Sequence, residues 1–392
     1  MSGWKAVAIG DLVSSAKTWN PMRSAMDDVF SYIDLSAVDQ DAKTIVGARE
    51  IVCGDAPSRA RQLVEKGDVL VSTVRPNLNG VARVPEELDG ATASTGFCVL
   101  RPRNHSIDGA YLFQWVKSPM FISDMVRKAT GASYPAVSDR IVAESRIPLP
   151  VLPEQRRIAE ILDKAEDLRT KRRVALGQLD TLNQSIFLEL FGDPVANPKG
   201  WAKRAFGEIC ESRLGKMLDQ KQQTGKHLHP YLRNANVQWF HFDLSEVYEM
   251  DFDSTARDEF RLRDGDLLIC EGGEPGRAAI WRSQLPECYY QKALHRARPR
   301  EGQANSEYLA WLLWFLSNRG GLGDHVTAAT IAHLTGEKLK AMRIPLPPFP
   351  LQQEFARRVV AVDKLKTAHL AALAELDALF ASLQHRAFRG EL

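Results

Sequence analysis

Hydrophobic residues recur every three or four positions along two long stretches of the chain. In the first stretch, residues 154–191, they are Ile158, Ile161, Ala165, Leu168, Ala175, Leu179, Leu182 and Ile186. In the second they are Phe355, Val359, Val362, Leu365, Ala372, Leu376, Leu379 and Leu383. Spacing that alternates three and four is typical of a coiled-coil seam, so the pattern predicts two long helices.

Each predicted helix would be about 50 Å long at the rise of an α-helix. Neither helix could bury its hydrophobic stripe alone, and the narrow seam favours pairing of the two helices with each other. An antiparallel pair would place a globular part at each end. The alternative is that each helix packs on its own globular part.

The rest of the chain alternates short β-rich runs with turn signals. GDVLVSTV (residues 67–74) and GDLLICEGG (residues 265–273) each give a turn followed by a short strand. Asn-Gly, Asp-Gly and proline turns separate the runs that follow them. Short helices are expected at residues 111–126 and 308–317. This pattern predicts α+β domains of irregular mixed β-structure with short helices.

The phrase RIPLP occurs at residues 146–150 and again at residues 343–347, an offset of 197 residues. The same offset aligns Gly3-Trp4 with Gly200-Trp201, Tyr111-Leu112 with Tyr308-Leu309, and Gln155 with Gln352. Chance does not keep one offset over this range, so the chain contains two copies of one unit. The prolines remove amide donors and fix φ, so we expect a stiff extended connector that neither continues a sheet nor enters a helix early.

The repeat divides the chain into four segments. The expected globular domains are residues 1–150 and 193–347, and the expected helices are residues 151–192 and 348–392. With 392 residues, the chain is long enough for two separate cores.

Composition narrows the class of protein. The chain is 44% hydrophobic and 26% charged, as in ordinary globular proteins, and it carries no 18-residue apolar run and no signal-peptide pattern. We therefore expect a cytoplasmic protein without a membrane partner. The five cysteines form no C-x-x-C pair and are interpreted as reduced packing residues.

A net charge of only +2 does not by itself indicate a nucleic-acid-binding protein. Residues 292–300 (KALHRARPR) form one candidate basic patch, with a solvated charged face as the alternative.

Catalytic motifs are missing from the sequence. It contains no phosphate-binding G-x-x-x-x-G-K-[ST], no G-x-S-x-G, no H-E-x-x-H and no dinucleotide-binding G-x-G-x-x-G. The nine histidines form no convincing ligand set. We expect no catalytic, metal or cofactor site on this chain, so any catalysis would belong to a partner.

Polar, turn-prone loops follow the predicted strands, for example STVRPNLNG in the first copy and EGGEPGRAA in the second. Their Arg and Asn side chains offer donors suited to base edges and phosphates. The two copies differ mostly in such loops and agree mostly at junctions and helices. Two domains that recognise different targets on one scaffold would show this pattern, although ordinary loop solvation is the commoner explanation for any single one of these residues.

Three segments of the chain resemble the specificity subunit of type I restriction-modification systems. They are RIPLPVLPEQRRIAEILDKAEDL, the preceding GDVLVSTVRP, and RIPLPPFPLQQEFARRV in the second copy. The resemblance covers essentially the whole chain, although Leu351 stands where the first copy has Glu154. It implies a non-catalytic subunit with two target recognition domains that read a bipartite, asymmetric DNA site, joined by an antiparallel pair of spacer helices. It also implies two methyltransferase subunits and further restriction/translocase subunits as partners. S-adenosylmethionine, ATP and Mg would bind to those partners, and no cofactor would bind to this chain.

The resemblance also suggests which residues contact DNA. In the first half these are Ser72, Thr73, Arg75, Asn77 and Tyr134. In the second half they are Arg233, Asn234, Asn236, Arg277, Lys292 and Thr330. The alternative function is a coiled-coil scaffold or adaptor that binds only proteins, motivated by the weak net charge.

Overall fold

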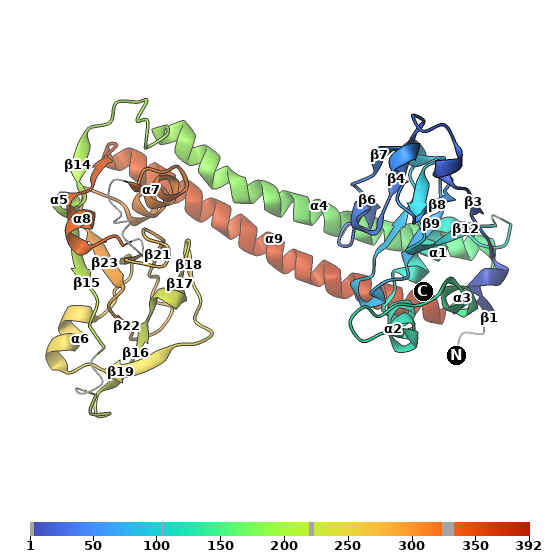
Figure 1. The fold of residues 1–392 in the computed structure, drawn as a ribbon. Coiled ribbons are helices and arrows are strands. Elements are labelled where there is room, and N and C mark those ends of the chain that lie inside the picture. The colour runs from blue at the N-terminus through green and yellow to red at the C-terminus, as the bar shows by residue number, and fades with distance from the viewer. Residues whose placement is uncertain (1–3, 104, 219–222, 324–332) are drawn as a thin grey trace. The chain divides into compact units, whose positions relative to one another are not determined.

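The computed structural model describes residues 4–103, 105–218, 223–323 and 333–392 (Figure 1). The chain forms two compact units, one made of Met1–Arg173 with Ala371–Leu392 and the other of Val174–Leu370. Each unit therefore contains one globular part together with segments of both long helices, α4 (Leu152–Phe191) and α9 (Phe349–Arg389).

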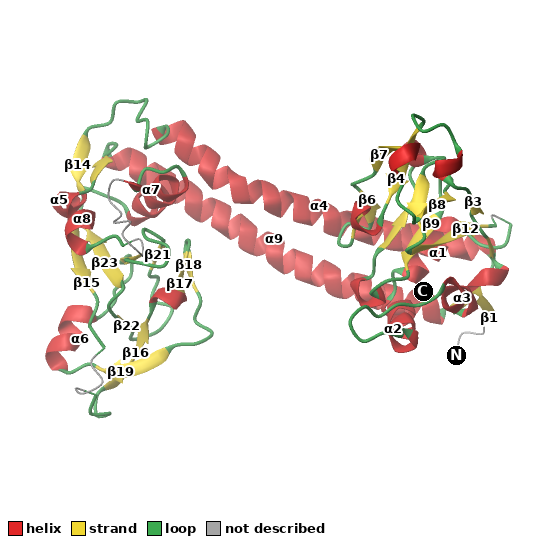
Figure 2. Cartoon of the chain, in the orientation of Figure 1, coloured by secondary structure: helices red, strands yellow, loops and turns green. Residues whose placement is uncertain are grey.

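Among its described residues, the first unit combines three short α-helices with two main sheets (Figure 2). The short helices are α1 (Gly109–Val116), α2 (Pro119–Lys128) and α3 (Asp139–Glu144). One sheet has the order β10 (Val81–Arg83), β9 (Val69–Ser72), β12 (Phe97–Pro102) and β2 (Val13–Ser14). The other has the order β3 (Lys17–Thr18), β8 (Ala60–Leu63), β11 (Thr92–Ser94), β4 (Val29–Ile33) and β7 (Arg49–Val52). Two small pairs are β1 (Ala6–Ala8) with β13 (Arg146–Pro148) and β5 (Val38–Asp39) with β6 (Thr44–Ile45).

The second unit follows the same plan. Its short helices are α5 (Phe206–Ile209), α6 (Ser254–Phe260), α7 (Ser306–Asn318) and α8 (Gly336–Ala341). One sheet has the order β15 (Cys210–Leu214), β23 (Leu294–Pro299), β20 (Leu267–Cys270) and β21 (Ala278–Ile280). The other has the order β19 (Tyr248–Asp251), β16 (Leu228–Leu232) and β22 (Tyr289–Tyr290). The small pairs are β14 (Lys203–Ala205) with β24 (Arg343–Pro345) and β17 (Val237–Gln238) with β18 (His241–Phe242).

The two units agree strand by strand in their four-stranded sheets, and each has one parallel strand pair in its other sheet. That pairing joins β11 to β4 in the first unit and β22 to β16 in the second. They differ beside it, where the first unit inserts β8 and the second has the helix α6. The internal repeat and the mixed fold that the sequence predicts are therefore confirmed, with divergence concentrated in one sheet.

The two RIPLP phrases form short strands, so the prediction that this segment cannot join a sheet is wrong. Ile147 lies opposite Val7, and the flanking bonds run from the Ile9 amide to Ser145 and from the Leu149 amide to Lys5. In this antiparallel ladder the odd-numbered residues of the phrase form the hydrogen bonds, so the missing donor of Pro148 points away from the partner strand. The second copy repeats this pairing between β14 and β24.

A buried glutamine at the start of each long helix holds the connector in place. The Gln155 side chain donates to the Pro150 carbonyl at 2.9 Å and accepts from the Asp108 amide at 2.8 Å. Gln352 makes the equivalent bonds to Pro347 and Asn305. The glutamine thus ties the connector, the long helix and the short helix α1 or α7 together in each unit.

The long helices pair antiparallel within each unit, as the seam predicts. In the first unit Arg169 of α4 contacts Asp377 of α9 at 2.5 Å, and in the second Lys366 of α9 contacts Asp180 of α4 at 2.7 Å. From Arg169 to Asp180 the residue number rises along α4, while the contacted residue in α9 changes from Asp377 to Lys366. Residue numbers that run in opposite directions indicate an antiparallel pair.

The predicted seam is wrong in detail. Leu168, Leu182, Leu365 and Leu379 belong to the seam yet are 39–53% exposed. Side chains at the helix ends that the seam omits are instead buried in the globular cores: Ala159, Leu162, Phe187, Phe191, Phe380, Ala387 and Phe388. Each helix end faces both its partner helix and a domain, so it buries a wider stripe than a coiled coil requires.

One expected helix is broken in two. The sequence predicts a single helix over residues 111–126, but α1 ends at Val116 and α2 begins at Pro119. Ser118 accepts the Phe121 amide as the cap of α2, and proline at the first helical position has no donor to lose there. The break therefore follows from local capping.

All five cysteines are free and buried, which confirms their interpretation as packing residues. Burial raises the pKa of Cys98 and Cys210 to about 12, so these thiols are unreactive at neutral pH. Along the described ranges no helix is long and apolar enough to cross a membrane.

Candidate nucleic-acid interface

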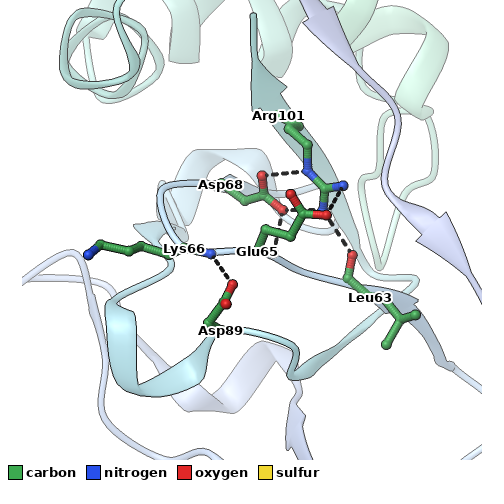
Figure 3. Close-up of polar contacts among 6 residues, drawn as sticks. All are labelled: Leu63, Glu65, Lys66, Asp68, Asp89 and Arg101. Carbon is green, nitrogen blue, oxygen red and sulfur yellow. Dashed lines mark hydrogen bonds and ion pairs between the residues drawn. The ribbon is translucent and has the colours of Figure 1, made fainter. Parts of the chain in front are cut away.

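A buried ion pair fixes the turn that leads into the first candidate loop. Arg101 on β12 contacts both carboxylate oxygens of Asp68, at 3.0 and 2.8 Å, while Asp68 also accepts the Glu65 amide (Figure 3). Gly67 precedes it with φ +88°, a conformation that favours glycine. Arg298 and Asp266 form the same arrangement in the second unit. The repeated Gly-Asp pair is thus a structural turn that sets the start of β9 and β20.

The last residue of β9 and the loop after it contain four of the candidate residues, and two of these make hydrogen bonds within the domain. Thr73 is 7% exposed and donates through its hydroxyl to the Gly96 carbonyl. The Ser72 hydroxyl donates to the Val74 carbonyl at 2.9 Å. Both side chains hold the loop, and only Arg75 and Asn77 are exposed.

Arg75 and Tyr134 come together from segments far apart in sequence. Arg75 has φ +49°, its amide donates to the Pro135 carbonyl at 2.7 Å, and its guanidinium lies 4.7 Å from the centre of the Tyr134 ring. Tyr134 is 68% exposed. A left-handed conformation is unusual for arginine, and such strain concentrates at functional sites. The pair presents a cation and an aromatic face to solvent, a combination suited to phosphates and bases.

In the second unit the turn after β16 contains three candidates. Asn236 is 3% exposed, accepts the Arg233 amide and donates to the carbonyls of Asp243 and Glu246. It is a structural residue. The Arg233 guanidinium lies 3.6 Å from the Tyr248 ring centre and contacts Glu246 at 2.9 Å.

The equivalent turn of the first unit carries different chemistry. There the capping position is Asp34, and Arg49, the counterpart of Tyr248 at the start of the paired strand, forms an ion pair with it. The arginine of this pair therefore lies on the strand in the first unit (Arg49) and on the turn in the second unit (Arg233).

Asn234 and Arg277 join the turn after β16 to the loop after β20. Asn234 donates to the Gly272 carbonyl at 2.7 Å, and its own carbonyl accepts from Arg277 at 3.1 Å. Arg277 also contacts Glu274 and is mostly buried. The structure therefore brings Arg233, Asn234 and Arg277 together, with Arg277 acting chiefly as a brace.

The basic stretch 292–300 is not a surface patch. His295 and Arg296 are buried on β23, Arg296 contacts Glu211, and Arg298 contacts Asp266. The charges of this central strand are paired, Arg296 with the exposed carboxylate of Glu211 and Arg298 with the buried carboxylate of Asp266. Lys292 precedes this strand and is exposed. Thr330 lies outside the described residues.

The sequence does not indicate two further residues that lie at these candidate DNA-contact turns. Tyr248 supports Arg233, and Arg49 occupies the equivalent place in the first unit. Their positions at the first residue of paired strands could have been found only by aligning β7 with β19, which the changed loop lengths obscure. Within the described ranges no group of His, Cys, Asp and Glu is arranged to hold a metal ion.

Comparison with known protein families matches residues 1–176 and 198–376 to the type I restriction modification DNA specificity domain. The type I restriction enzyme EcoKI specificity subunit of Escherichia coli (strain K12) is 25% identical over 318 residues, covering 76% of this chain and 68% of that protein. The crystal structure of the HsdS subunit from Thermoanaerobacter tengcongensis is similar with a TM-score of 0.53 and 29% identity, covering 100% of this chain and 98% of that one. A chain from a structure of the type I R-M system, concerned with complex assembly and conformational transition, gives a TM-score of 0.68 and 28% identity, covering 100% of this chain and 99% of that one. Since the family match spans both halves, the chain belongs to the type I restriction-modification DNA specificity family.

Proposed function

We propose that each unit of this specificity subunit reads one part of a split, asymmetric DNA site. The observation that carries the proposal is the changed chemistry at one shared position, Asp34 with Arg49 in the first unit and Arg233 with Tyr248 in the second. A common scaffold with different side chains at this position would select different bases in each half. Arg75 with Tyr134 and Arg233 with Tyr248 are the proposed contact pairs.

A DNA selection experiment tests this reading. The chain, assembled with a type I methyltransferase subunit, would be incubated with random duplexes, and the retained DNA sequenced. We expect two short conserved blocks separated by a spacer of fixed length, and no enrichment with the methyltransferase subunit alone. A single continuous block, or no enrichment by the complex, would overturn the proposal and favour a protein-binding adaptor.

The internal repeat also supports docking of two methyltransferase subunits. The connector, the buried glutamine and the helix start recur in both units, so the chain contains the same local structure twice. Catalysis, S-adenosylmethionine, ATP and Mg would then reside on the methyltransferase and restriction/translocase partners. Native mass spectrometry should give two methyltransferase subunits per chain, and a limit of one would contradict this stoichiometry.

A further inference from the structure

The second unit contains a cavity of about 500 Å³ between α7, the turn before β18 and the paired long helices. Aromatic rings form one side: Phe240 stacks on Trp311 with ring centres 4.2 Å apart, and Trp314 meets Trp311 edge-on. Polar side chains also line the cavity, among them Asp180, Asn183, His241, Arg282, Glu307, Asp363 and Lys366. The cavity thus combines aromatic faces with carboxylates.

The polar side has hydrogen-bond acceptors to spare. Glu307 pairs with Arg282, and Asp180 pairs with Lys366. Asp363 receives a hydrogen bond from Asn183 but has no ion-pair partner among the described residues. Asn183 is 3% exposed, and its buried Oδ1 has no hydrogen-bond partner. A buried acceptor without a donor is costly, so this site favours a ligand that donates.

The first unit shows what fills the corresponding space. Glu166, the counterpart of Asp363 one repeat earlier, forms an ion pair with the buried ammonium of Lys117. Lys117 is the counterpart of Trp314, and its Nζ lies 4.4 Å from the centre of the Phe113 ring. The first unit therefore supplies a lysine ammonium to the helix carboxylate and to an aromatic face from within its own chain.

The turn beside the site is also shared. Lys43 and Phe240 each directly precede the second strand of a small hairpin, and both have left-handed backbones, with φ +57° and +66°. In the first unit Lys43 donates to the Asn79 carbonyl at 2.6 Å. In the second unit the strained position holds a bulky aromatic ring at the cavity, where strain needs a compensating role. Lys43 and Lys117 of the first unit thus correspond to the aromatic residues Phe240 and Trp314 of the second unit.

We propose that the cavity of the second unit binds a primary alkylammonium group supplied from outside the chain. The ammonium would donate to Asp363 and to Asn183 Oδ1, while the alkyl chain packs on Trp311, Trp314 and Phe240. Burial raises the pKa of Asp363, although Lys366, Asn183 and Arg282 act to lower it. The source is either a free polyamine or a lysine side chain of a partner subunit.

The test titrates the intact chain with n-butylammonium and with butan-1-ol, its neutral analogue of similar shape, by calorimetry. We expect saturable binding of one butylammonium and binding of the alcohol at least about tenfold weaker. Asp363→Asn should weaken butylammonium binding about tenfold, while Glu166→Gln, the matched change in the first unit, should leave it unaltered. Equal binding of the alcohol, no saturable binding, or unchanged binding by Asp363→Asn would overturn the proposal.

Two further variants test the same proposal by butylammonium titration. Trp314→Lys copies the first unit and should abolish butylammonium binding, because the new side chain fills the site. Lys117→Ala should create a second butylammonium site beside Glu166, and its absence would show that the comparison between units does not hold. The source is resolved in the complex with methyltransferase subunits, an arm that rests on the proposed function. A partner's lysine would block butylammonium there, whereas a free polyamine as the natural ligand predicts that spermidine competes with it in the complex.

Discussion

Arg169 of α4 pairs with Asp377 of α9, and their counterparts one repeat away, Lys366 and Asp180, pair in the other unit. Each helix therefore gives one cation and one carboxylate to the helix pair, in the same antiparallel register. Arg169 also lies 4.4 Å from the centre of the Phe380 ring, which joins the ion pair to the hydrophobic contact at the end of α9.

Exchanging the charges of this pair tests the register. Asp377→Arg alone should destabilise the first unit by about 1 kcal/mol, because the new arginine would face both Arg169 and Arg173 of α4. Adding Arg169→Asp should recover part of that loss, since Arg173 still faces the new arginine, as measured by a double-mutant cycle in urea unfolding. The same exchange within one helix, at Asp167 and Lys171, is the control and should change stability by less than about 0.5 kcal/mol. Absence of coupling between Arg169 and Asp377 would contradict the register.

Replacing the buried glutamine should loosen each connector. Gln155→Leu leaves the Asp108 amide and the Pro150 carbonyl without this partner, so we expect a loss of about 1–3 kcal/mol. Gln352→Leu should behave alike in the second unit. Gln178→Leu, at an exposed position of α4, provides the matched control. If all three variants unfold at the same urea concentration as the parent chain, the glutamine has no such role.

Asp251 should make one loop of the second unit sensitive to acid. Burial acts to raise its pKa, but the amides of His227, Gly225 and Thr224 outweigh burial and lower it from 3.8 to about 2. A lowered pKa means that the carboxylate stabilises the fold fully above about pH 4 and loses this effect as the pH falls toward 2.

Hydrogen exchange can measure this effect directly. Protection of the amides of Thr224, Gly225 and His227, corrected for intrinsic exchange, should fall between pH 4 and pH 2 in the parent chain. Asp251→Asn should lose that protection already at neutral pH, while Asp258→Asn, an exposed change on α6, should not. Protection that is independent of pH in the parent chain would show that Asp251 does not anchor the loop.

The sequence predicts the scaffold better than it predicts the surface. The repeat, the two long helices and the β-rich domains follow from periodicity and from one offset, because burial enforces those patterns. The roles of Asn236 and Thr73 could not be read from the sequence, since both are polar residues used to hold turns. The burial of Arg296 depends on Glu211, a partner 85 residues away that no local pattern indicates.

Removing the exposed pair of the first unit should weaken DNA binding without unfolding the chain. Arg75→Ala and Tyr134→Ala each remove one member of the stack, and loss of a base contact costs about 1–3 kcal/mol. Retention of the selected duplex by the assembled complex should drop accordingly at fixed salt concentration. Arg157→Ala, which removes an exposed arginine paired with Glu154 at the helix start, serves as the control. Equal retention for all variants would exclude Arg75 and Tyr134 from the interface.

The most direct test of the central claim is a genome-wide map of adenine methylation. Cells would express a type I methyltransferase subunit with either the parent chain or a chain whose globular part in the second unit comes from another family member. If the two units read separate half-sites, the first half of the methylated motif and the spacer length stay the same while the second half changes. A motif that changes in both halves, or in neither, would contradict the account.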